Sequence, residues 1–105
     1  MESVSNNALE AARAKLAEAE AKREELLLRH IANGVNIASR TVEIDESVVI
    51  APGATILAGT ILRGKTVIGA GCVIGPNSLI EDSTVDEGTT DNASQVYGSH
   101  LGPHA

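Results

Sequence analysis

From Ile44 to Ile80 the chain carries an aliphatic residue at every sixth position, and no other feature limits its possible folds as strongly. A small or medium-sized residue stands two places before each of the last six of these aliphatic residues. Turn formers such as Pro52-Gly53 and Pro76-Asn77 lie at the positions between. An amphipathic helix would repeat about every 3.6 residues and a half-buried strand about every two, so neither produces this spacing. A period of six indicates a parallel β-helix of hexapeptide repeats. The repeat consists of Ile44, Ile50, Ile56, Leu62, Ile68, Ile74 and Ile80.

The geometry of the predicted β-helix follows from this period. If each hexad forms one short strand and a corner, three hexads close a triangular coil, and residues three hexads apart lie one above another. Past Ile80 the interval shortens, and a Ser or Thr two places earlier marks the next inward positions as Val85, Asp91, Val96 and Leu101. The stretch from Ile44 onward then makes about three and a half coils. The predicted columns are Ile44, Leu62 and Ile80, then Ile50 and Ile68, then Ile56 and Ile74.

Asp91 is the exception among the inward positions. The register places its carboxylate in the column of Ile56 and Ile74, where an uncompensated charge is costly. Two interpretations stay open, a frayed end of the coil and a polar contact made only in an oligomer. The predicted structural core is therefore aliphatic and comprises Ile44, Ile50, Ile56, Leu62, Ile68, Ile74, Ile80, Val85 and Val96.

A different structure is predicted before Asn33-Gly34. Residues 8–33 are expected to form one long α-helix, because Ala, Leu, Glu, Lys and Arg dominate and neither Gly nor Pro interrupts them. Asn7 is the expected N-cap, and Gly34 supplies the left-handed conformation that ends a helix. Residues 1–7 are expected to be flexible, and residues 34–105 to form the β-helix. The helix is expected to pack on a neighbouring surface through Leu26, Leu27 and Ile31.

Composition excludes several classes of partner. The formal net charge is -6 and Tyr97 is the single aromatic residue, so the chain lacks both the positive field and the stacking surfaces of a nucleic-acid-binding protein. Apolar runs are too short for a membrane span, and no secretory signal opens the sequence. The lone Cys72 cannot form an internal disulfide, so we expect a cytoplasmic protein.

Three segments in order resemble a known family. They are Asn33-Gly34-Val35 after a basic helix, the hexads running through Gly69-Ala70-Gly71-Cys72-Val73-Ile74-Gly75-Pro76-Asn77-Ser78, and Glu81-Asp82-Ser83. Over about residues 20–105 the chain resembles the linker helix and first coils of the bacterial bifunctional N-acetylglucosamine-1-phosphate uridyltransferase/glucosamine-1-phosphate acetyltransferase, which serves UDP-N-acetylglucosamine biosynthesis. The resemblance implies a left-handed coil and a homotrimer.

The same resemblance implies where activity would lie. The family's nucleotide-binding domain precedes the helix, and its acetyl-transfer motifs lie in coils beyond the position matching Ala105. Neither set of motifs occurs in this sequence, so no catalytic residue is carried over. We expect the chain to resemble the spacer between two active sites, and its β-helix to be incomplete at the C-terminal end.

Few residues suggest chemistry of their own. His100 and His104 are weak candidate metal ligands, since a zinc site needs at least three protein ligands and only these two lie close in sequence. Cys72 occupies a small-residue position, which favours a buried inert thiol. Gly69 and Gly71 suit corners better than a phosphate loop, because no helix pattern follows them. Tyr97 is expected to pack or to cap.

Three functions from different classes remain. The first is a trimerising structural module without activity of its own and with no cofactor. The second is a reduced hexapeptide-repeat acyltransferase that uses acetyl-CoA in the cleft between prisms. The third is a small metal-binding β-helix protein that uses His100 and His104.

Overall fold

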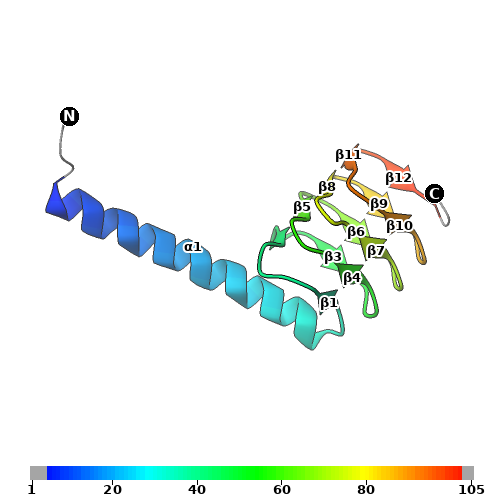
Figure 1. Ribbon diagram of the computed structural model, residues 1–105, viewed down its shortest axis with the longest axis horizontal. Coiled ribbons are helices and arrows are strands. Elements are labelled where there is room, and N and C mark those ends of the chain that lie inside the picture. Colours follow the sequence, from blue (N-terminus) through cyan, green and yellow to red (C-terminus); the bar gives the residue numbers. More distant parts are fainter. Residues whose placement is uncertain (1–4, 103–105) are drawn as a thin grey trace.

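A computed structural model describes residues 5–102, in which one long helix is followed by a stack of short strands (Figure 1). The helix, α1, spans Asn6–Ala32. The strands are β1 (Asn36–Ile37), β2 (Glu43–Ile44), β3 (Val49–Ile50), β4 (Thr55–Ile56), β5 (Ile61–Arg63), β6 (Val67–Ile68), β7 (Val73–Ile74), β8 (Leu79–Glu81), β9 (Thr84–Val85), β10 (Thr90–Asp91), β11 (Gln95–Tyr97) and β12 (His100–Leu101).

The strands form a three-walled parallel β-helix. Each wall is a sheet of four parallel strands, in the orders β1-β4-β7-β10, β2-β5-β8-β11 and β3-β6-β9-β12. The predicted columns are confirmed, because Ile44 pairs with Leu62, Ile50 with Ile68, and Ile56 with Ile74 in the registers of the three walls. The shortened steps after Ile80 are confirmed as well, since Val85, Asp91, Val96 and Leu101 continue these columns.

The coil begins one strand earlier than the sequence indicated. Strand β1 pairs with β4 and places Ile37 beside Ile56 in the first wall. There are therefore four strands in each wall of the described chain, where a start at Ile44 predicted about three and a half coils. Ile37 was missed because the corner at Ser39–Thr41 holds one residue more than the later corners, so a strict period of six does not reach it.

The inward aliphatic residues make one continuous core. Leu62, Ile68 and Ile80 are completely buried, and Val96 and Leu101 pack partly buried against the same cluster. The small residues two places earlier, such as Thr60 and Cys72, are buried too, because they line the corners. Side chains of medium size thus fill the narrow interior, and aromatic rings are not needed.

Helix α1 is capped differently from the expectation. Its N-cap is Ser5, whose hydroxyl accepts the Ala8 N–H at 3.2 Å, so the helix begins at Asn6, and Asn7 lies in the first turn. Of the segment 1–7, residues 1–4 lie outside the described chain. At the other end Gly34 has φ 92°, and the N–H groups of Gly34 and Val35 donate to the carbonyls of Ile31 and His30. This pairing is a Schellman motif, which satisfies helix carbonyls that would otherwise lack donors.

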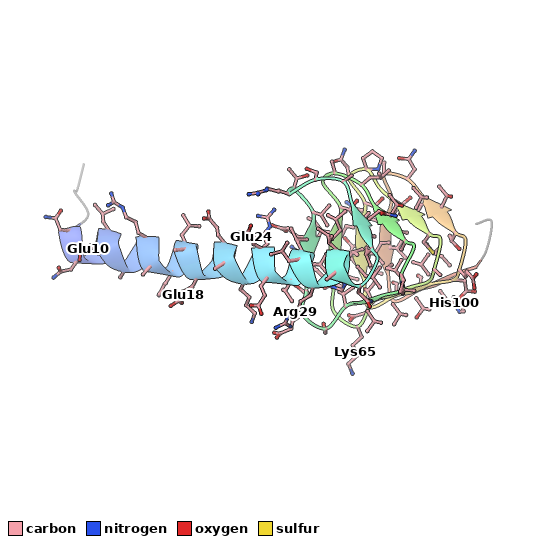
Figure 2. All side chains as sticks on the ribbon, turned by 90° about the horizontal axis from the view of Figure 1, so that it is seen from below. Glu10, Glu18, Glu24, Arg29, Lys65 and His100 are labelled. Atoms are coloured by element: carbon pink, nitrogen blue, oxygen red, sulfur yellow. The ribbon has the colours of Figure 1, made fainter. Side chains whose placement is uncertain are left out.

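The helix touches the prism only near its C-terminal end. It contacts β1 and β2, and Leu27 is its one buried residue, with Leu26 half-buried. Ile31 was expected as a third anchor, but it is 48% exposed because it lies beside an open notch at Val35 and Ile37. Residues 5–22 are all exposed, and the N-terminal part of the helix around Glu10 projects away from the prism (Figure 2). At about 1.5 Å per residue the helix is roughly 40 Å long, so much of it has no partner.

Corner glycines set the turns between strands. Gly64 has φ 64°, and a Cβ there would lie 2.1 Å from Oδ1 of Asp82. That oxygen accepts the Lys65 N–H at 2.9 Å, so the close approach belongs to a hydrogen-bonded link between successive coils. A side chain at Gly64 would break this link. Within residues 5–102, no helix is both long and apolar enough to cross a membrane.

Candidate functional site

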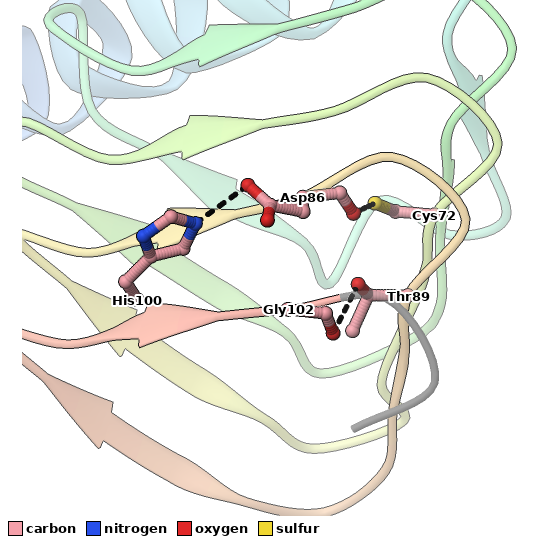
Figure 3. Close-up of polar contacts among 5 residues, drawn as sticks. All are labelled: Cys72, Asp86, Thr89, His100 and Gly102. Carbon is pink, nitrogen blue, oxygen red and sulfur yellow. Dashed lines mark hydrogen bonds and ion pairs between the residues drawn. The ribbon is translucent and has the colours of Figure 1, made fainter.

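The outer surface of the last two coils carries one close pair of ionisable side chains. His100 lies on β12, and Asp86 directly follows β9, the neighbouring strand of the same wall. Nε2 of His100 lies 2.6 Å from Oδ1 of Asp86, with the two side chains 65% and 38% exposed (Figure 3). An exposed hydrogen-bonded pair of this kind contributes at most about 1 kcal/mol to stability. It also leaves an imidazole accessible to a ligand.

Cys72 lies close to the same pair but faces the other way. Its thiol is fully buried and donates to the backbone carbonyl of Asp86 at 2.9 Å (Figure 3). Figure 3 shows the thiol and the imidazole of His100 on different sides of Asp86. The arrangement therefore brings Cys, Asp and His together without forming a nucleophile and base, because the sulfur is enclosed and engaged by the backbone.

Sequence reasoning did not place these three residues together. Cys72 and Asp86 are 14 residues apart, as are Asp86 and His100. That interval is a little less than one coil where the steps shorten, so each residue lies about one coil from the next. The shortened step is visible in the sequence, but the side chains that it brings together depend on the shape of the corner, which the repeat does not specify.

The expected metal ligands are only partly described. His100 is exposed on β12 and pairs with Asp86, whereas His104 lies outside residues 5–102. Among the described residues, no group of three or more His, Cys, Asp and Glu side chains is arranged to hold a metal ion. A metal site that includes His104 therefore remains a prediction.

Three other residues singled out in the sequence have clear positions. Gly69 lies at a corner where a Cβ would be 2.6 Å from the Glu87 backbone nitrogen, which accounts for its identity without a phosphate. Tyr97 is exposed on the outer face of β11. Asp91 is 9% exposed on β10, and its backbone carbonyl accepts the Gly75 N–H at 2.8 Å. Strand β10 is therefore paired with β7 and the Asp91 side chain points inward, in the last coil of the described residues, so both interpretations of Asp91 stay predictions.

A groove that the sequence did not reveal runs between α1 and the second wall. Its volume is about 620 Å³, and Lys22 of the helix forms an ion pair with Glu46 of the prism at 3.2 Å across it. Charges of both signs line the groove, so it offers no strongly charged subsite for a phosphate or a carboxylate. The lining comprises Ala19, Lys22, Arg23, Leu26, Glu43, Ile44, Asp45, Glu46, Ser47, Ile61 and Arg63.

Comparison with known proteins agrees with the coil. The family model described as bacterial transferase hexapeptide (six repeats) matches residues 47–82. The bifunctional protein GlmU of Bifidobacterium longum subsp. infantis is 45% identical over 75 residues, which cover 70% of this chain and 16% of that protein. GlmU of Alkaliphilus oremlandii is 38% identical over 101 residues, 89% of this chain and 22% of the relative. GlmU of Geobacillus sp. (strain WCH70) is 42% identical over 92 residues, which cover 86% of this chain and 20% of that relative.

The matches cover most of this chain but only 16% to 22% of the length of these curated relatives. They include the hexads that build the three walls, and the register of those walls is the one that a six-residue repeat demands. Residues 47–82 therefore carry the hexapeptide repeat of bacterial transferases, and the chain is similar in sequence to a part of the bifunctional GlmU proteins.

Proposed function

We propose that the chain is a trimerising structural module that has no transferase activity by itself. The observation that carries this proposal is a pair of valines on the outside of the third wall. Val49 on β3 and Val67 on β6 are neighbours in register and are 59% and 42% exposed. Single exposed aliphatic side chains are common, but two side by side on a regular wall suit contact with another prism.

The shape of the prism supports the same proposal. Its walls are short ladders of parallel strands, so a second prism can lie alongside with side chains matched rung by rung. In a closed ring of three copies each prism meets two neighbours, so the valine pair of one copy would lie against a different face of the next. The trimer is also what the resemblance to the acetyltransferase family implies. The lone free thiol, Cys72, agrees with a cytoplasmic location.

Light scattering of the purified chain tests the proposal. The expected mass is near three times 10.8 kDa. Val67→Asp is expected to dissociate the trimer, because it would place a carboxylate in an apolar contact. Thr90→Asp is the matched control, since Thr90 is exposed on a different wall. A wild-type chain that remains a monomer at all concentrations would contradict the proposal.

An acyltransferase that uses acetyl-CoA is the second candidate. It is favoured by the transferase description of the matching family and by the accessible pair of His100 and Asp86, since an imidazole beside a carboxylate can serve as a general base. An acetyl-transfer assay with glucosamine 1-phosphate separates the two functions. We expect no turnover. Turnover that disappears in His100→Ala would establish the transferase instead.

A metal-binding β-helix protein is the third candidate, and it depends on His100 together with His104. We expect no bound metal and no cofactor. Metal analysis of the purified chain, repeated on His100→Ala, tests this. Stoichiometric zinc that is lost in the variant would indicate a metal site and contradict the structural proposal.

A further inference from the structure

The three walls differ in the charge that they present to the outside. On the described strands, the charged residues Glu43, Arg63 and Glu81 face outward, and all three lie on the second wall. The third wall carries only His100, on its last strand, and the first wall presents uncharged residues throughout. The core of an interface is depleted of charged residues, because a charge that loses water there needs a partner. The first and third walls therefore suit a contact between copies better than the second. The outward residues of the first wall are Asn36, Thr55, Val73 and Thr90.

Exposed aliphatic side chains of α1 gather beside the first wall. Leu28 and Ile31 lie at i and i+3, so they share one side of the helix, and they are 57% and 48% exposed. An open notch of about 260 Å³ leads from Ile31 onto β1 and β4. No ionisable side chain lines this notch, so it suits an aliphatic side chain. Its lining comprises Ile31, Val35, Asn36, Ile37, Ala38 and Thr55.

The winding of the coil sets the heights at which two copies would meet. The chain passes from β1 through β2 and β3 to β4, so β3 lies between β1 and β4 in height along the prism (Figure 1). By the same rule β6 lies between β4 and β7. In a side-by-side ring, equivalent coils of neighbouring copies lie at one height. Val49 of one copy is then level with the notch of the next, and Val67 is level with the space between Thr55 and Val73.

We propose that the third wall of one copy lies against the first wall of the next, and that Val49 fills the notch beside Ile31. Val67 then packs between Thr55 and Val73 of that copy. The inference rests on the proposed trimer and specifies its contact. Val49 is 59% exposed and so protrudes where the neighbouring surface recedes. Because the two walls differ, the contact repeats around a ring and closes it, and the charged second wall stays in water.

Charge substitution across the contact tests this arrangement. Sedimentation equilibrium gives the dissociation of the trimer for each variant. Val49→Lys and Ile31→Asp should each weaken the trimer at least about tenfold, because each places a charge in an apolar contact. The chain that carries both substitutions should recover most of the loss, since the introduced ammonium of one copy then meets the introduced carboxylate of the next.

Two controls are matched to these changes. Leu9→Asp alters an exposed leucine of α1 about 33 Å from Ile31 along the helix, so the trimer should be unchanged. Thr90 lies higher on the first wall, between β9 and β12 in height and thus level with Thr84 and His100 of the neighbour. Thr90→Asp would meet polar side chains there and should also leave the mass unchanged.

Cross-linking identifies the two walls without relying on a weakened trimer. Val49→Cys mixed with Ile31→Cys should form a linked pair with a short bismaleimide, and a chain with both substitutions should give a covalent ring of three. Cys72 is fully buried and should not react. Val49→Cys that links efficiently to itself would place two third walls together and overturn the proposal.

The outcomes also separate this contact from the trimer itself. A wild-type trimer that Val49→Lys dissociates but Ile31→Asp leaves intact would overturn the contact with the first wall and leave the trimer standing. A wild-type chain that is monomeric at every concentration would overturn both.

Discussion

Single inward residues carry most of the stability of this prism, because each coil has only three of them. Ile68 illustrates the arrangement, since it is fully buried between Ile50 and Val85 in the column of the third wall. Every inward side chain lies in register with the ones above and below it and belongs to one continuous core shared by the three walls. A change at one position is therefore expected to disturb its neighbours in that core.

Ile68→Asp is predicted to unfold the prism. A buried carboxylate without a partner typically costs several kcal/mol, which is a large share of the stability of a small domain. Circular dichroism at 25 °C and urea titration measure the effect. Glu81→Lys is the control on the outside of β8, where the new side chain would lie in register with Arg63 and cost at most about 1 kcal/mol. Equal tolerance of both changes would contradict the inward assignment.

Asp91→Val is predicted to stabilise the chain by about 1 to 3 kcal/mol, because it removes an acceptor that is buried without a donor. The measurement is the shift of the urea midpoint at a concentration low enough that copies do not associate. A variant less stable than the wild type under these conditions would show that the carboxylate has a partner within its own chain.

Among the elements, α1 is anchored to the prism over a short length. Its last turns hold Leu27, the half-buried His30 and the Schellman motif at Gly34, whereas residues 5–22 contribute no buried side chain. The stability of the helix in water then rests on propensity and i, i+4 pairs such as Glu25 with Arg29, at 2.7 Å. The N-terminal part is accordingly the first segment expected to open.

His30 gives the helix end a dependence on pH. Burial lowers the pKa of its imidazole below the ordinary 6.5, since a charged ring loses water there. The unfolded chain then binds more protons between the lowered pKa and 6.5, so this contribution to stability is present above pH 6.5 and declines as the pH falls below it. We predict that urea midpoints measured at pH 7.5 and pH 5.5 differ less in His30→Gln than in the wild type. An unchanged difference would remove His30 as the cause.

At the scale of the whole molecule, the prism is a one-dimensional stack. Each coil bonds only to the coil before it and the coil after it, as in the orders β1-β4-β7-β10 and β2-β5-β8-β11. Stability in such a stack is close to a sum of coil and interface contributions. The first coil gains from α1, while the last coil of residues 5–102 pairs with one other coil among the described strands and contains Asp91.

Hydrogen exchange is predicted to show that the last coil of the described chain is less stable than the middle of the stack. The amide of Leu57 donates to Ile74 in the middle of the stack, and the amide of Asp86 donates to Leu101 in the last coil, both at 2.8 Å. The Asp86 amide should exchange faster, because the last coil can open without disturbing the rest. Mass spectrometry or NMR at low concentration measures both rates. Equal rates would indicate that the prism opens as a single unit.

Particular residues show how much of the fold could be predicted from the sequence. Ile50 and Ile68 could be assigned to one column from the sequence because a period of six permits only one stacking of three walls, and the aliphatic side chains repeat without exception. The same reasoning located Asp91 inside the prism. Ser5 as the cap and Ile37 as the first inward residue were missed, because a cap depends on local backbone geometry and the Ser39–Thr41 corner departs from the period.

The sequence by itself thus determined the fold and its columns, since periodicity in side-chain size dictates which residues can share a narrow interior. Tertiary structure alone decided that Ile31 is exposed, that Asp86 joins Cys72 to His100, and that α1 covers one end while leaving Asp91 at the other. These features depend on the angle between elements and on the detailed shape of corners. Neither is encoded in a repeat, because a repeat fixes what each coil has in common and not how its edges meet their surroundings.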